Sequence, residues 1–192
     1  MLDYIRKIAD DIQAGMKKLM GKDTIFFGMI PDTLLGNVWM AAGNDNLVAI
    51  DFDLDESEFV QQTQKLSGAH LAHSDEAINE IAARLLSYLE GNSKTIDYPV
   101  DLSTVSKFQR EVLLAVSNIQ RGQIITYGEI ARIVGQPKAS QAVGQALRWN
   151  PVPIVIPCHR VVHADGTLGG YGGRMGIERK IKLLQLEGAI LA

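Results

Sequence analysis

The sequence predicts an α+β chain in which a small sheet with helices precedes a mostly helical second part. Three runs rich in β-branched and aromatic residues come before a long stretch of helical periodicity, at residues 24–30, 34–42 and 47–52. The charge balance also reverses along the chain. Residues 1–102 carry 8 basic and 17 acidic side chains, whereas residues 103–192 carry 11 and 5. We therefore expect two domains, residues 1–98 and 99–192, joined at a polar connection.

The first domain is expected to contain an antiparallel sheet and flanking helices. Residues 43–46 read Gly-Asn-Asp-Asn, a turn typical of a hairpin between the last two strands. An additional N-terminal helix is expected over residues 2–20, where apolar residues recur at spacings of three and four. Two further helices are expected over residues 56–66 and 74–89, and the hydroxyl of Ser74 can cap the second of them.

The second domain has the pattern of a helix-turn-helix. An apolar face over residues 107–120 predicts one helix. Thr126 and Glu129 form a capping box that starts a helix over residues 127–134, and the next helix is expected over residues 139–148. The helix expected over residues 139–148 has mostly small side chains. A helix that recognises bases in the major groove would instead carry long side chains with hydrogen-bond donors. Helix pairs of this kind are also common in plain packing, so the pattern alone leaves DNA binding open.

The only cysteine of the chain, Cys158, lies between Pro157 and His159. Residues 154–156 are apolar, and we expect a buried extended segment that Pro157 forces to turn. A thiol beside an imidazole can form a nucleophile and base, although a lone cysteine is also a common apolar core residue. A single cysteine excludes an internal disulfide and a cysteine-rich zinc site. We therefore expect neither a metal nor a cofactor.

A set of motifs in the second half shares one family resemblance. The sequence PCHRV at residues 157–161 is accompanied, in chain order, by TYGEIA at 126–131, GQPKA at 135–139, AVG at 142–144, GGYGG at 169–173, LL at 183–184 and EG at 187–188. This collinear set resembles the O6-alkylguanine-DNA alkyltransferases, also called methylated-DNA–protein-cysteine methyltransferases. The resemblance implies a ribonuclease H-like first domain and a second domain that binds DNA and accepts the alkyl group.

The activity that the resemblance implies is DNA repair by direct reversal. The alkyl group of O6-alkylguanine, and also of O4-alkylthymine, would be transferred irreversibly and in a single turnover to Cys158. His159 would take the thiol proton through a water, and Glu187 would hold the other ring nitrogen. Tyr127 would donate to N3 of the purine, and Asn150 would tie the helix-turn-helix to the acceptor loop.

The remaining site residues are also implied by the resemblance. The pocket for the base would be lined by Val161, Tyr171, Gly172, Gly173 and Lys180. The expected DNA contacts are Gln109, Tyr127, Gly128, Gln136, Gln141, Arg148 and Ala164.

Gln141 departs from the family pattern, which has an arginine at this position. In the family the arginine enters the duplex and fills the gap left by the flipped nucleotide. Glutamine lacks the charge and the planar stacking surface of a guanidinium. We expect transfer to persist while duplex binding weakens.

Three other functions stay open at this point. One is an alkyltransferase-like sensor that binds the lesion with weak or no transfer, although such proteins replace the acceptor cysteine. A Cys–His hydrolase and a transcription regulator are the other two. In hydrolases of that kind the catalytic Cys and His are generally distant in sequence, and the small residues of the second helix disfavour a regulator.

The expected partner is double-stranded DNA, bound by a monomer through the minor groove and largely independently of sequence. No apolar run is long enough to span a bilayer, and the chain does not start with the basic and apolar pattern of a secretory leader. We expect no membrane association and a cytoplasmic location, or a nuclear one in a eukaryote.

Overall fold

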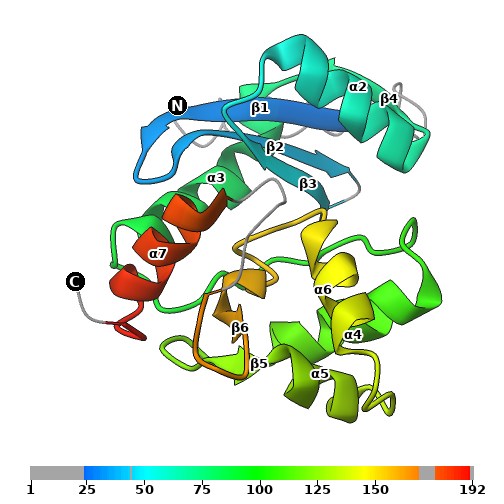
Figure 1. The fold of residues 1–192 in the computed structure, drawn as a ribbon. Coiled ribbons are helices and arrows are strands. Elements are labelled where there is room, and N and C mark those ends of the chain that lie inside the picture. Colours follow the sequence, from blue (N-terminus) through cyan, green and yellow to red (C-terminus); the bar gives the residue numbers. More distant parts are fainter. Residues whose placement is uncertain (1–23, 44, 169–175, 191–192) are drawn as a thin grey trace.

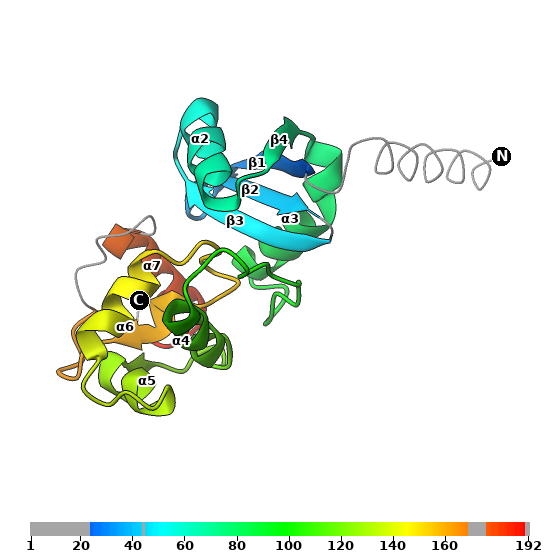
Figure 2. The same cartoon turned by 90° about the vertical axis from the view of Figure 1, so that its right-hand side faces the viewer.

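The computed structural model describes residues 24–43, 45–168 and 176–190, and it confirms the predicted α+β class (Figure 1). A four-stranded sheet with its helices forms the sheet half, residues 24–102. Four helices and a two-stranded sheet form the helical half, residues 103–190. Figure 2 shows one half above the other. Within the described ranges, no helix is both long and apolar enough to cross a membrane.

The sheet has the strand order β3-β2-β1-β4. Its strands are β1 (Thr24–Thr33), β2 (Gly36–Gly43), β3 (Asn46–Phe52) and β4 (His70–His73). The predicted hairpin is confirmed, because β2 and β3 run antiparallel with Gly43 paired to Asn46. The sequence did not predict β4, which pairs in parallel with β1. Only Leu71 of its four residues is buried, so the strand has almost no alternation to recognise. The N-terminal helix expected over residues 2–20 lies outside the described residues.

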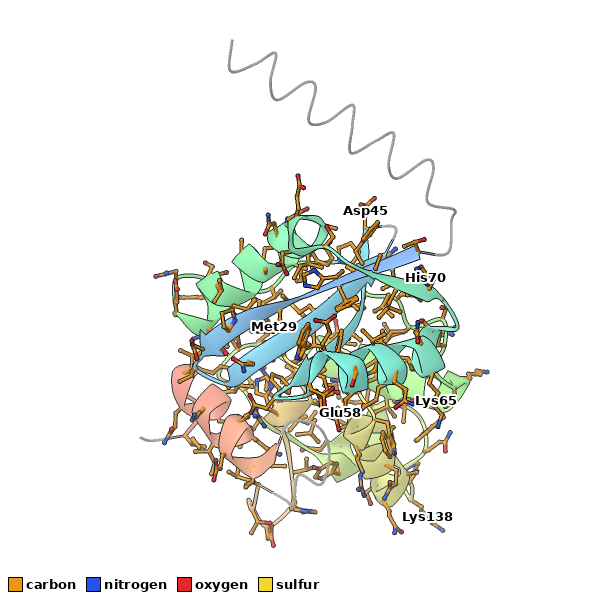
Figure 3. The ribbon with its side chains drawn as sticks, turned by 90° about the horizontal axis from the view of Figure 1, so that it is seen from above. Met29, Asp45, Glu58, Lys65, His70 and Lys138 are labelled. Carbon is orange, nitrogen blue, oxygen red and sulfur yellow. The ribbon has the colours of Figure 1, made fainter. Side chains whose placement is uncertain are left out.

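Both faces of the sheet are covered by a predicted helix. Helix α2 (Glu56–Ser67) starts at a capping box formed by Asp55 and Glu58, and its Phe59 packs with Trp39 on one face. Figure 3 looks onto this face, where Met29 is labelled. Helix α3 (Asp75–Leu89) covers the other face and is capped by Ser74, as predicted. Because both faces of the sheet are buried, consecutive residues of its central strands are apolar, instead of alternating with polar residues.

The helical half contains α4 (Lys107–Ser117), α5 (Tyr127–Ile133), α6 (Ser140–Arg148) and α7 (Gly176–Leu186). The predicted capping box of α5 is present, with Glu129 N donating to Thr126 Oγ1 at 3.2 Å. Strands β5 (Ile125–Thr126) and β6 (Val161–Val162) pair in parallel. This short sheet brings the start of α5 next to the segment that carries the cysteine.

The two halves share backbone hydrogen bonds and a hydrophobic core. The amide of Ile50 on edge strand β3 donates across the two halves to the carbonyl of Pro151, at 2.8 Å. The amide of Leu47 on the same strand donates to the carbonyl of Pro99, near the end of the sheet half, also at 2.8 Å. One continuous apolar cluster runs from the α3 face of the sheet to the helices around Cys158. The predicted domain boundary between residues 98 and 99 therefore stays a prediction. We propose that it separates two segments of the sequence that share one hydrophobic core.

We expect Gly28→Ala to destabilise the fold, because α3 lies directly on β1 at this residue. An added Cβ would lie 2.4 Å from Asp75 Oδ1 and 2.9 Å from Ile78 Cδ1, and overpacking of this kind costs about 1–3 kcal/mol. Urea denaturation measures the free energy of unfolding. Gly128→Ala is the matched control, since the nearest atom to its added Cβ is 4.0 Å away. Equal stabilities for the two variants would show that α3 can move away from β1 without cost.

Candidate active site

The cysteine lies in a single 3-10 turn, Cys158–Arg160, and Cys158 is only 1% exposed. The prediction of an extended segment over residues 154–156 is wrong, because these residues belong to a tight turn in which Ile154 has a φ of 74°. Their apolar side chains correctly signalled burial, but burial alone does not distinguish a strand from a buried turn. With three residues per turn, the neighbours Cys158 and His159 are about 120° apart rather than on opposite faces.

Asn150, the second residue after α6, binds the sulfur and the loop that leads to it. Its Nδ2 donates to Cys158 Sγ at 3.1 Å and to the carbonyl of Ile156 at 2.9 Å. Its Oδ1 accepts from the amide of Val152 at 3.1 Å. A donor on sulfur favours the thiolate over the thiol, since hydrogen bonds to the charged form stabilise it. One side chain therefore holds the sulfur in position and donates a hydrogen bond that stabilises its charged form.

His159 and Glu187 form a buried pair. The distance from His159 Nε2 to Glu187 Oε1 is 2.6 Å, and neither side chain is exposed. The other ring nitrogen, Nδ1, is buried without a hydrogen-bond partner among the described residues. If Nε2 donates to the carboxylate, Nδ1 keeps its lone pair and is the atom that can accept a proton.

Glu187 accepts hydrogen bonds from two further side chains. Arg160 donates from Nε to Oε2 at 2.8 Å and from Nη2 to Oε1 at 3.1 Å. The hydroxyl of Tyr88, on α3 of the sheet half, donates to Oε1. Burial by itself would raise the pKa of Glu187, but the hydrogen bonds from His159, Arg160 and Tyr88 outweigh it and lower the pKa below its usual range. The carboxylate is therefore ionised.

The pKa values of Tyr88 and His159, which both bind Glu187, shift in opposite directions. Burial and the bond to Glu187 raise the pKa of Tyr88 to about 12. Burial lowers the pKa of His159, and the charges of Arg160 and Lys180 act in the same direction against the raising effect of Glu187. His159 is therefore neutral at physiological pH, which is the form that a general base requires.

Tyr127 begins α5 and approaches the sulfur from the side of the helix-turn-helix. Its pKa is raised by burial and by the charge of Cys158. The hydroxyl therefore stays protonated and can donate a hydrogen bond. On α6, a Cβ added to Gly144 would lie 3.9 Å from Tyr127 Cε1, an ordinary van der Waals distance, so the ring of Tyr127 lies beside this position of α6.

Lys180 is a fully buried lysine of α7 whose pKa is lowered to about 8 by burial. Its Nζ donates to the carbonyls of Val161 and Leu168, both at 2.6 Å. The carbonyl of Val161, which the resemblance assigns to the base pocket, thus already accepts one hydrogen bond and keeps a second lone pair. The other three pocket residues, Tyr171, Gly172 and Gly173, lie outside the described residues.

The expected DNA contacts occupy different environments on the helix-turn-helix and beside it. Exposed side chains are found at Gln136, Gln141, Arg148 and Ala164. Gly128 is partly buried, and so is Gln109, whose Nε2 donates to the carbonyls of Ala146 and Trp149 at 3.1 and 2.9 Å. Gln109 therefore ties α4 to the end of α6. Figure 3 labels Lys138, which lies in the turn that joins α5 and α6.

Sequence reasoning missed two residues of the site. Arg160 was visible inside PCHRV but received no role, because its partner Glu187 is distant in sequence. Tyr88 gave no local signal at all, since it is separated from Glu187 by 99 positions and belongs to the sheet half. A buried tyrosine on an amphipathic helix is indistinguishable from a core residue until its hydroxyl partner is known.

The fold and the site together define a class of protein in which a helix-turn-helix is followed by a buried, hydrogen-bonded cysteine. Comparisons with known proteins narrow this class. Residues 107–189 match the family described as 6-O-methylguanine DNA methyltransferase, DNA binding domain. Residues 25–102 match the description 6-O-methylguanine DNA methyltransferase, ribonuclease-like domain.

Relatives of similar length support the same assignment. The methylated-DNA–protein-cysteine methyltransferase of Salmonella typhimurium is 36% identical, over 83% of this chain and 94% of that protein. The inducible one of Bacillus subtilis is also 36% identical, over 88% and 87%. The crystal structure of Mycobacterium tuberculosis OGT in complex with DNA has a TM-score of 0.73 at 34% identity, over 85% of this chain and 93% of that one. The chain belongs to the O6-alkylguanine-DNA alkyltransferase family.

Folding stability is expected to fall as the pH drops below about 6.5, because His159 is buried in its neutral form. The pKa of His159 is about 6.5 in the unfolded chain and is lowered in the folded protein. At a pH between these two pKa values only the unfolded chain binds the proton, so acid favours unfolding. Glu187 has a pKa lowered from 4.5, so its contribution is lost only at lower pH. Urea denaturation at neutral and mildly acidic pH measures the effect. His159→Gln should reduce this pH dependence, and an unchanged dependence would contradict it.

Proposed function

We propose that this chain repairs alkylated DNA by direct reversal, transferring the alkyl group from O6 of guanine, and from O4 of thymine, to Cys158. The observation that carries the proposal is the pair of buried contacts, Asn150 to Cys158 and His159 to Glu187, placed directly after a helix-turn-helix. The family membership and the DNA-bound structural relative support it.

The chemistry follows from the orientation of the donors and acceptors. The thiol proton of Cys158 moves through one water to Nδ1 of His159, while Nε2 stays bonded to the Glu187 carboxylate. The sulfur attacks the carbon attached to O6, and the pair of the breaking C–O bond stays on the guanine. Tyr127 donates its O–H at N3 of the purine, where negative charge develops. Guanine regains a proton, so the net change is exchange of the thiol hydrogen for the alkyl group.

The product is a thioether, and this makes each molecule act once. A sulfide does not release its alkyl group to water, and no second thiol exists in the sequence to take it over. The presence of Cys158 disfavours the lesion-sensor alternative, in which no acceptor remains.

The lesion must leave the base stack to reach a cysteine that is 1% exposed. We infer that a monomer binds the minor groove, because α6 presents small residues that let its backbone approach sugars and phosphates without reading base edges. The exposed Arg148 would add a phosphate contact. A reactive thiol also requires a reducing compartment, the cytoplasm or, in a eukaryote, the nucleus.

Incubation with duplex DNA that contains O6-methylguanine should raise the mass of the intact protein by one CH₂ group, with a stoichiometry of one. Peptide mapping should place the adduct on Cys158, and Cys158→Ser should gain no mass. Tight binding without an adduct would support a sensor instead, and repeated turnover without an adduct would support a hydrolase.

Gln141→Arg should tighten binding to duplex DNA and accelerate transfer, each by roughly tenfold, because a guanidinium adds charge and a stacking surface. Gel-shift titration and single-turnover transfer on duplex and single-stranded substrates measure this. Gln123→Arg, an exposed position in the loop before β5, adds the same charge as a control. The account would be wrong if both variants bound duplex equally well, or if the gain on single strands matched that on duplex.

A further inference from the structure

The catalytic base of this protein is oriented by a carboxylate that both halves of the chain hold. One oxygen of Glu187, Oε1, accepts from His159 Nε2 in the helical half and from the hydroxyl of Tyr88 in the sheet half. Tyr88 is 2% exposed, so water cannot replace its hydroxyl. A carboxylate that can rotate about its terminal bond is fixed only when its oxygens have distinct partners.

The hydroxyl of Tyr88 is part of a closed ring of hydrogen bonds. Arg160 Nη2 donates to the Tyr88 oxygen at 3.1 Å, and Arg160 Nε donates to Glu187 Oε2 at 2.8 Å. Because the tyrosine oxygen accepts from Arg160, its own proton is directed at Glu187. The ring thus determines which carboxylate oxygen faces His159.

The aromatic ring of Tyr88 is itself held in place. The Arg121 guanidinium lies over it at 4.8 Å from the centroid, and Arg121 Nη2 donates to the carbonyl of Leu186 at 2.6 Å. Leu186 immediately precedes Glu187. Arg121 therefore fixes the tyrosine and the backbone of the carboxylate relative to each other.

We propose that Tyr88 is a positioning residue for alkyl transfer, through which the sheet half completes the active site by holding and partly neutralising Glu187. The inference rests on the proposed function. The acidic and basic groups around the His159–Glu187 pair are Arg160 on the 3-10 turn, Arg121 before β5, Lys180 on α7 and the sulfur of Cys158. Tyr88→Phe changes none of these side chains, but it removes the oxygen that accepts from Arg160 Nη2.

Removal of that oxygen has a predictable electrostatic sign. The hydrogen bond from Tyr88 lowers the pKa of Glu187, so without it the carboxylate attracts protons more strongly. The carboxylate is still ionised but has lost one competing donor, so it stabilises protonated His159 more strongly and the pKa of His159 rises. The base becomes protonated at a higher pH than in the unchanged protein, and the acidic limb of the transfer rate should move in the same direction.

Tyr88→Phe tests the proposal. The second-order rate of transfer from O6-methylguanine in duplex DNA would be measured from about pH 5 to about pH 9, together with the thermal midpoint of unfolding. We expect the rate at neutral pH to fall roughly threefold to tenfold, within the range for the net loss of one intramolecular hydrogen bond, and the acidic midpoint to move to higher pH. Tyr98→Phe removes a hydroxyl from a half-buried tyrosine outside the ring and should change neither.

A second measurement separates this inference from the proposed function. Protonation of His159, followed by NMR of ¹⁵N-histidine-labelled protein, should have its midpoint at a higher pH in Tyr88→Phe than in the unchanged protein, whether or not DNA is present. If the unchanged protein acquires no methyl group, the proposed function fails while this titration still tests Tyr88. An unmoved midpoint in both the rate profile and the titration would overturn the role of Tyr88, even if the variant were slower.

Discussion

The buried carboxylate of Glu187 is the constraint on which the rest of the site depends. A charge in the interior is tolerated only if its oxygens are paired, and here an imidazole, a guanidinium and a phenol supply the partners. These partners come from the 3-10 turn and from α3, while Glu187 itself follows α7. The need to pair one charge therefore fixes α3, α7 and the turn that carries the cysteine relative to one another. The neutral state of His159 has a different cause, because burial lowers its pKa against the raising effect of Glu187.

Most elements of the fold were predictable from local patterns. The hairpin between β2 and β3, the helices with caps at Ser74 and Thr126, and the helix-turn-helix all carry signals within a few residues of one another. Strand β4 was not predictable, because it is held by its pairing with β1 rather than by alternation of its own side chains. The turn at Ile154 was mistaken for extended chain, since a left-handed β-branched residue is stabilised only by its surroundings.

The candidate site was predictable where the residues are close in sequence and part of the family motifs. Asn150, Cys158 and His159 belong to one short segment, and the resemblance supplied Glu187. The contribution of Tyr88 depends on how α3 packs against the helical half, which no local pattern reports. Gln109 has contacts that the sequence did not predict, because its Nε2 donates to the end of α6, while its expected contact with DNA stays a prediction. Three-dimensional contacts decide which polar side chains are available to a ligand.

The covered edge of β3 has a consequence for folding of the chain during its synthesis on the ribosome. The amides of Leu47 and Ile50 receive their acceptors from Pro99 and Pro151, which are synthesised long after the strand itself. Until Pro151 has emerged from the exit tunnel, this edge offers unpaired donors to any neighbouring strand. The nascent chain is therefore most exposed to mispairing with other polypeptides during that interval, and chaperone protection matters most before translation ends.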